Sequence, residues 1–165
     1  MMRLIAAALL ASMVPGAALA QEAPAGPDVS QDTAWHNRQM LALAKLKDAD
    51  GWRPLTGNVR WRRTAGNGSG QHPSVADIIT INYAGSFIDG TVFDSSYERG
   101  QPATFPLGAL IQGWQIAIPK AGVGDTIEIA IPADLAYGTT GKGPIPGDAT
   151  LFFKVELLAI VPQER

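Results

Sequence analysis

Residues 77–96, DIITINYAGSFIDGTVFDSS, contain the strongest strand signal in the chain. Ile79, Ile81 and Tyr83 recur at every second position, with polar side chains between them, so they share one face of an extended segment. The Asp-Gly pair at 89–90 then favours a tight turn. The stretch is therefore predicted to form a long, half-buried strand that turns back into a shorter one.

Several other segments on both sides of this stretch have the composition of short strands. The predicted strands are residues 59–64, 77–87, 91–94, 103–105, 126–131 and 151–160. An apolar segment at 110–118 predicts a short helix, and the Gly- and Pro-rich residues 132–148 predict a long loop. An antiparallel sheet with one short helix against its apolar face makes the predicted fold class α+β.

The first 20 residues have the layout of a secretory signal peptide. Arg3 gives a positive start, residues 4–13 are an Ala- and Leu-rich apolar run, and Ala18-Leu19-Ala20 is a small-x-small cleavage site. The apolar run is too short for a comfortable membrane span. We therefore predict a signal peptide at residues 1–20 that is cleaved after Ala20, a periplasmic protein, and no stable membrane insertion after cleavage.

Residues 21–56 are predicted to be a flexible leader, rich in Pro, Ala and Gly, followed by a helix. Asp32 or Thr33 can cap this helix, which is expected to run to about Lys47 and to end before Asp50-Gly51. Its apolar side chains fall roughly on one side: Trp35, Met40, Leu43 and Leu46. Packing of this side on the domain is favoured over dimerisation or contact with a client protein.

Composition excludes several functions. The net charge of −2 does not indicate a nucleic-acid partner, and the arginines at 60, 62 and 63 are expected on a solvated strand face. The absence of cysteine excludes disulfides and thiol chemistry. With only His36 and His72, neither a hydrolase triad nor a zinc site is expected. No glycine motif has nucleotide-binding spacing, so no cofactor and no metal are predicted.

Aromatic side chains are the main candidates for a site. They come from separate predicted elements, and together they are able to line a dry cavity between sheet and helix: Tyr83, Phe93, Phe105, Trp114, Tyr137 and Phe153. Each of them alone is more typical of a core position. A pocket with apolar walls and few polar groups suits a small apolar ring such as proline.

Five blocks of this sequence resemble the FKBP-type peptidyl-prolyl cis-trans isomerases, and they occur in the family's order. They are INYAG with DGTVFDSS at 81–96, FPLG at 105–108, LIQGW at 110–114, IPADLAYG at 131–138 and ATLFFKVELL at 149–158. The resemblance implies a half-β-barrel over residues 57–161, in which a twisted antiparallel sheet wraps around a short helix. It also implies an enzyme that isomerises the bond before proline in exported proteins and needs no cofactor.

The same resemblance implies roles for residues around a pocket. Trp114 is expected to be the floor under the prolyl ring, and Asp94 is expected at the pocket edge, paired with Arg99. The walls are expected to be Tyr83, Phe93, Phe105 and Phe153.

Further expected roles concern the substrate itself. Leu110 and Ile111 are expected to contact it, with the backbone N–H of Ile111 donating a hydrogen bond. The hydroxyl of Tyr137 is expected to donate another, and Ile145 is expected to cap the pocket from the long loop.

The chain departs from the family pattern at several positions. Ala103 stands where an aromatic wall residue often occurs, Lys142 is unusual in the long loop, and Pro119 follows the helix. These differences leave pocket width and the binding of macrolide inhibitors of the tacrolimus and rapamycin type open. Two alternatives also stay open: a low-turnover chaperone or peptide-binding module that uses the same pocket, and an envelope factor whose leading helix forms a dimer around client proteins.

Overall fold

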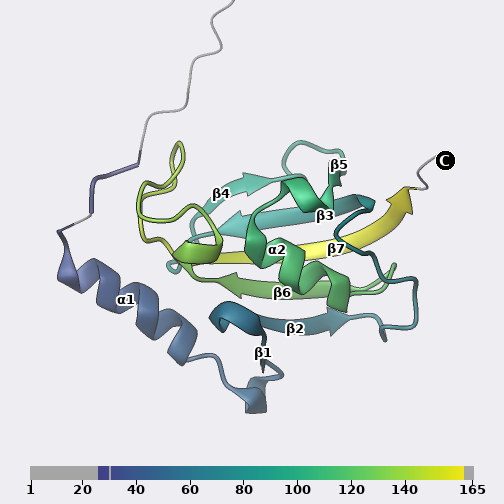
Figure 1. Cartoon of the computed structure of the whole chain (residues 1–165), viewed down its shortest axis with the longest axis horizontal. Helices are drawn as coiled ribbons and strands as arrows, with labels where there is room; N and C mark the ends of the chain where they lie inside the picture. The colour runs from purple at the N-terminus through teal and green to yellow at the C-terminus, as the bar shows by residue number, and fades with distance from the viewer. Residues whose placement is uncertain (1–25, 30, 162–165) are drawn as a thin grey trace, which may run out of the picture.

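The computed structural model describes residues 26–29 and 31–161, in which one antiparallel sheet curls around a short helix (Figure 1). The strands are β1 (Arg53–Pro54), β2 (Arg60–Ala65), β3 (Ile78–Ser86), β4 (Val92–Ser95), β5 (Ala103–Pro106), β6 (Thr126–Ile131) and β7 (Leu151–Val161). Their order is β1-β2-β6-β7-β3-β4, and β5 pairs with β3. All pairs are antiparallel. The predicted α+β fold is confirmed.

β3 organises the sheet because it pairs with three other strands, β4, β5 and β7. Its side chains alternate in burial along its whole length. Ile79 and Ile81 are fully buried and Tyr83 nearly so, as the period-2 pattern predicted. The start of β3 pairs with β5, where Ile79 lies opposite Phe105, and the end pairs with β4, where Gly85 lies opposite Asp94. β4 and β5 thus pair with the same edge of β3, opposite the edge that pairs with β7.

The helix α2 (Gln112–Ala117) packs on the concave face of the sheet (Figure 1). Gly113 allows this close contact, since a Cβ there would lie 2.4 Å from a side-chain carbon of Ile131. The helix is shorter than the predicted 110–118, because Leu110 is extended and Pro119 has no N–H to continue the helical hydrogen bonds. A 3-10 turn, Ile118–Lys120, follows instead.

The helix α1 (Thr33–Ala44) lies outside the sheet, on the side from which the loop between β6 and β7 projects (Figure 1). Asp32 caps it by accepting a hydrogen bond from the backbone N–H of Trp35 at 2.9 Å. The helix ends at Ala44, earlier than predicted, and the Asp50-Gly51 pair ends a separate 3-10 turn, in which Gly51 is left-handed with φ 85°.

The packing of α1 on the domain confirms the favoured interpretation of this helix. Leu43 forms a small cluster with Trp52 and Ala130 on the outer face of the sheet, and Phe152 packs against it. Met40 does not share this buried side, because 70% of it is exposed, and the buried neighbour on the helix is instead Gln39.

The predicted signal peptide and its cleavage site lie outside the described residues. Within the residues that the structure describes, no helix has the length and apolar character needed to cross a bilayer.

Candidate active site

A cavity of about 260 Å³ lies between α2 and the concave face of the sheet. It brings together nine of the eleven predicted site residues: Tyr83, Phe93, Asp94, Phe105, Leu110, Ile111, Trp114, Tyr137 and Phe153. They come from β3, β4, β5 and β7, from α2 and the turn before it, and from the loop after β6. Segments that are distant in the sequence therefore supply one continuous wall.

Trp114 lies at the centre of the aromatic part of this wall. Its ring centroid is 5.4 Å from that of Tyr83 and 5.1 Å from that of Phe153, and both pairs are nearly perpendicular. Phe93 contacts Phe153 in the same way at 5.8 Å. Edge-to-face pairs at these distances are favourable beyond their buried area. The rings consequently support one another and leave an apolar surface facing the cavity.

Gly85 is a residue whose role the sequence did not reveal, although it lies inside a recognised motif. A Cβ at this position would lie 2.7 Å from a ring carbon of Phe93 and 2.8 Å from one of Phe153. The missing side chain makes room for these two walls. A glycine in the middle of a strand pattern is the signal that indicates such a close approach.

The polar edge of the cavity is a cluster of Tyr83, Asp94 and Arg99. The Tyr83 hydroxyl donates to Asp94 Oδ2 at 2.5 Å, Arg99 Nη1 pairs with Asp94 Oδ1, and Arg99 Nη2 donates to the Tyr83 hydroxyl at 3.0 Å. Burial, together with the hydrogen bond to Asp94, raises the pKa of Tyr83. Tyr83 is thus a neutral phenol at neutral pH. Arg99 does not line the cavity but holds Asp94 as expected.

Two uncommitted donors belong to the cavity wall, besides Trp114 Nε1, which is buried and has no hydrogen-bond partner among the described residues. Among the described residues, nothing accepts a hydrogen bond from the backbone N–H of Ile111 or from the hydroxyl of Tyr137. Burial, and secondarily the charge of Asp94, raises the pKa of Tyr137, so its hydroxyl keeps its proton at neutral pH. The cavity therefore offers two hydrogen-bond donors within apolar surroundings.

Ile145 does not line this cavity, in contrast to the expected cap. It is buried in the core, and its N–H and C=O both pair with Lys142, at 3.0 and 2.9 Å. This short bridge turns the loop so that Ile145 faces a separate hollow of about 340 Å³, beside residues 26–29.

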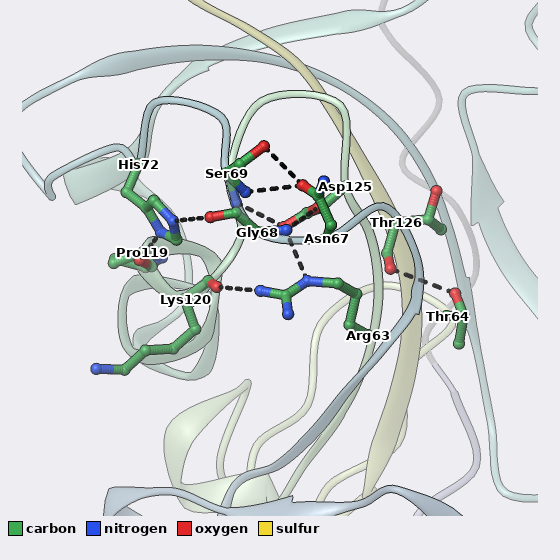
Figure 2. A network of polar contacts seen from close by, with 11 residues as sticks. Arg63, Thr64, Asn67, Gly68, Ser69, His72, Pro119, Lys120, Asp125 and Thr126 are labelled. Atoms are coloured by element: carbon green, nitrogen blue, oxygen red, sulfur yellow. Dashed lines mark hydrogen bonds and ion pairs between the residues drawn. The ribbon is translucent and has the colours of Figure 1, made fainter.

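A second polar network lies away from the cavity (Figure 2). Asp125 is almost fully buried and accepts hydrogen bonds from Arg63 Nε at 2.9 Å and from the N–H groups of Gly68 and Gly122 at 2.9 and 2.8 Å. Burial alone would raise the pKa of Asp125, but these three donors outweigh it and lower the pKa. Arg63 is exposed on β2, as predicted, and in addition its guanidinium is a structural partner of Asp125.

The described residues contain no cluster of three or more His, Cys, Asp or Glu side chains that could hold a metal ion. What the cavity presents chemically is aromatic surface, two neutral donors and one carboxylate that is already paired. Such an arrangement is suited to excluding water from an apolar ring and its neighbouring amide.

Comparison with known proteins agrees with this geometry. The model of the FKBP-type peptidyl-prolyl cis-trans isomerase family matches residues 69–158. The peptidyl-prolyl cis-trans isomerase Mip of Coxiella burnetii is 44% identical over 119 residues, covering 72% of this chain and 51% of that protein. The outer membrane protein MIP of Legionella longbeachae is 45% identical over 94 residues, covering 56% and 40%.

The fold likeness extends further along the chain than the family match. The crystal structure of a peptidyl-prolyl cis-trans isomerase from Pseudomonas syringae superimposes with a TM-score of 0.72 at 29% identity, covering 78% of this chain and 95% of that one. The chain spans about half or less of the two Mip relatives, 51% and 40%. Since the family model matches more than half of its 165 residues, the chain belongs to the FKBP-type peptidyl-prolyl cis-trans isomerases.

Proposed function

We propose that the protein catalyses cis/trans isomerisation of the peptide bond before proline in protein and peptide substrates. The observation that carries the proposal is the aromatic cavity around Trp114, which has two uncommitted hydrogen-bond donors in its wall. The proposed reaction requires no titrating acid or base. Membership of the isomerase family supports it.

The physical basis is the electronic structure of the amide bond. Resonance sets a rotation barrier of about 18–20 kcal/mol, and uncatalysed exchange at a bond before proline takes roughly tens to hundreds of seconds. The twisted transition state has lost this resonance and is less dipolar than the planar amide. A dry cavity therefore disfavours the ground state more than the transition state. Each ~1.4 kcal/mol removed from the barrier gives a tenfold faster rate.

In this proposal the prolyl ring rests on Trp114, and Leu110 contacts the substrate beside it. The N–H of Ile111 and the hydroxyl of Tyr137 donate to substrate carbonyl oxygens and hold the twisted chain. Asp94 orders the rim and accepts no proton during turnover. Water is excluded by the four aromatic walls: Tyr83, Phe93, Phe105 and Phe153.

Two further parts of the proposal concern domain and location. Residues 57–161 form the isomerase domain, and residues 1–20 are a signal peptide that directs the protein to the periplasm. The signal-like composition supports export, as does a relative named as an outer membrane protein. Mass spectrometry of the protein from its native envelope should find an N-terminus at Gln21, whereas an intact Met1 in the membrane fraction would contradict export.

The proposed activity is tested with the purified protein and a short proline peptide whose cis and trans forms are distinguishable. Phe153→Ala opens the cavity wall, and we expect kcat/KM to fall about tenfold or more. Phe152→Ala is the matched control, because Phe152 is the neighbouring residue on β7 and packs against Trp52 on the other face of the sheet. Phe153→Ala should cost about 3–5 kcal/mol in stability and Phe152→Ala less, because Phe152 is only partly buried, but only Phe153→Ala should reduce catalysis.

The result also separates the enzyme from its alternative. A peptide that binds without faster exchange would identify a low-turnover peptide-binding module. Full activity in a folded Phe153→Ala protein would contradict the proposed site. A macrolide of the tacrolimus or rapamycin type should compete with the peptide for the same cavity, which neither Ala103 nor Lys142 lines.

A further inference from the structure

The loop that carries Tyr137 is held by short backbone hydrogen bonds of its own and by few buried side chains. We define the pocket loop as residues 137–148, which lie between the 3-10 turn Ala133–Leu135 and β7. Ile145 and Pro146 are its only buried residues. It is rich in glycine, which loses much conformational freedom on ordering. The position of Tyr137 therefore depends on contacts from outside the loop.

The internal hydrogen bonds of the pocket loop connect its far end to Tyr137. The N–H of Gly141 donates to the Tyr137 carbonyl at 3.1 Å, and the N–H of Asp148 donates to the Gly138 carbonyl at 2.9 Å. A shift of the loop near Asp148 is consequently passed to the residue next to Tyr137.

The leader makes the first outside contact with this loop. The N–H of Gly26 donates to the carbonyl of Gly143 at 2.7 Å. The approach is close, since a Cβ on Gly26 would lie 2.9 Å from the Pro144 carbonyl oxygen and from the Pro146 nitrogen. The backbone of the leader thus lies directly on the loop.

The helix α1 makes the second set of contacts. Trp35 Nε1 donates to the carbonyl of Gly147 at 3.2 Å, and His36 Nδ1 lies 3.6 Å from a carboxylate oxygen of Asp148. Gly147 and Asp148 both lie at the C-terminal end of the pocket loop, where the N–H of Asp148 donates to the Gly138 carbonyl.

One turn further along, α1 is fixed to Thr150, the residue just before β7. The side chain of Gln39 accepts from the backbone N–H of Thr150 at 2.9 Å, and the Thr150 hydroxyl donates to the Gln39 carbonyl at 3.2 Å. Both residues are buried. Beyond them, Leu43 packs on Ala130 of β6. The helix therefore has one end anchored on the sheet and the other end on the pocket loop.

We infer that residues 26–29 and α1 form a brace that holds the pocket loop and thereby positions the Tyr137 hydroxyl at the cavity. Trp35 and Gln39 are positioning residues in this scheme, because neither lines the cavity. The structural part of the inference stands on the contacts alone, and its catalytic part rests on the proposed isomerase function.

The test uses the full chain with Trp35→Phe, which keeps an aromatic ring but removes the Nε1–H donor. Met40→Ala is the matched control, on the exposed side of the same helix. Hydrogen exchange is measured at three pocket-loop amides that donate hydrogen bonds within the loop: Lys142, Ile145 and Asp148. We expect exchange to become about three- to tenfold faster in Trp35→Phe, as for the loss of one hydrogen bond, with no change at the buried amides of β3 and none in Met40→Ala.

The catalytic part is tested by a double-mutant cycle with Tyr137→Phe, which removes the hydroxyl that the brace is inferred to position. Trp35→Phe alone should lower kcat/KM about three- to tenfold. In the Tyr137→Phe background it should have no further effect. Additive losses would overturn the positioning role, since Trp35 would then act by another route.

The outcomes separate this inference from the proposed function. Unchanged exchange at the three loop amides would overturn the brace whether or not the protein is active. Faster loop exchange with unchanged kcat/KM would overturn positioning of Tyr137. If the parent protein does not isomerise the peptide, the proposed function and the catalytic part of the inference both fail, and the exchange comparison still decides whether the brace exists.

Discussion

Asp94 is the carboxylate at the rim of the cavity, and its contacts argue against acid/base chemistry. Both of its oxygens are engaged, one by the Tyr83 hydroxyl and the other by Arg99. The neighbouring phenols are no alternative near neutral pH, because burial raises the pKa of both Tyr83 and Tyr137 above the ordinary value near 10. The described wall of the cavity therefore relies on aromatic surface and neutral donors.

We predict that Asp94→Asn lowers kcat/KM moderately, by about three- to tenfold. Asparagine can still accept from Tyr83, but it loses the charge that pairs with Arg99, so the rim becomes less ordered. The profile of kcat/KM between about pH 6 and 9 should be flat in both proteins, since no group that titrates there is required. If kcat/KM depended steeply on pH and this dependence disappeared in Asp94→Asn, the desolvation mechanism would be wrong and acid/base catalysis by Asp94 would be indicated.

At the scale of the elements, His72 links the loop between β2 and β3 to the 3-10 turn Ile118–Lys120 (Figure 2). Its Nδ1 lies 3.0 Å from the Pro119 carbonyl and its Nε2 lies 3.0 Å from the Gly68 carbonyl. Carbonyl oxygens only accept, so both ring nitrogens can donate only when the imidazole is protonated.

The pKa of His72 is raised by these contacts, first by the Gly68 carbonyl and then by Pro119. Burial lowers it slightly, the charge of Asp125 adds to the rise, and Arg63 opposes it. A group whose folded pKa is raised stabilises the fold fully below its unfolded pKa of about 6.5 and loses this contribution as pH rises through the folded value.

We therefore predict that His72→Ala destabilises the protein most at about pH 5.5 and progressively less toward pH 8.5. Urea unfolding of both proteins across this range measures the difference in unfolding free energy. His36→Ala is the control, and it should leave the pH slope that His72 produces in place. A His72→Ala difference that stays constant with pH would show that the ring contributes by packing and not by its charge.

At the scale of the whole molecule, the described residues form two unequal apolar clusters. The main cluster is formed by residues between Val59 and Leu157, all within the sheet, α2 and their loops. The smaller cluster joins Leu43 and Trp52 to Ala130, and so depends on α1. Because the main cluster contains no residue of the N-terminal segment among its buried members, the domain has its own core.

We predict that a chain beginning at Gly51 folds but is less stable than the full chain. Loss of the Leu43 contact alone removes about 1.5–3 kcal/mol, and Thr150 loses the buried acceptor supplied by Gln39. Circular dichroism and urea unfolding should show a cooperative transition at a lower midpoint. An insoluble or unfolded product would mean that α1 belongs to the folding core, and the proposed boundary near residue 57 would be wrong.

How much was predictable depends on the range of the interactions involved. The longer strands and the buried faces of β3, β6 and β7 followed from period-2 alternation, because strand geometry alone sends successive side chains to opposite sides. The two-residue strand β1 was not predicted, since it is too short to show any alternation. The cavity residues followed from motifs whose spacing matches the family. The exposure of Met40 and the early end of α1 did not follow from the sequence. A short amphipathic pattern does not fix the exact orientation of a helix, which depends on the surface against which it packs.

The amino-acid sequence by itself determined where six of the seven described strands lie, which face of the longer ones is apolar, and that aromatic side chains from separate segments belong to one pocket. Only the tertiary structure decided which distant polar groups meet. Asp125 is paired with Arg63, and Trp35 with the carbonyl of Gly147, across 62 and 112 residues of chain. The physical reason is that periodicity is a property of the local backbone, whereas these partners are selected by how the whole sheet, its loops and α1 pack together.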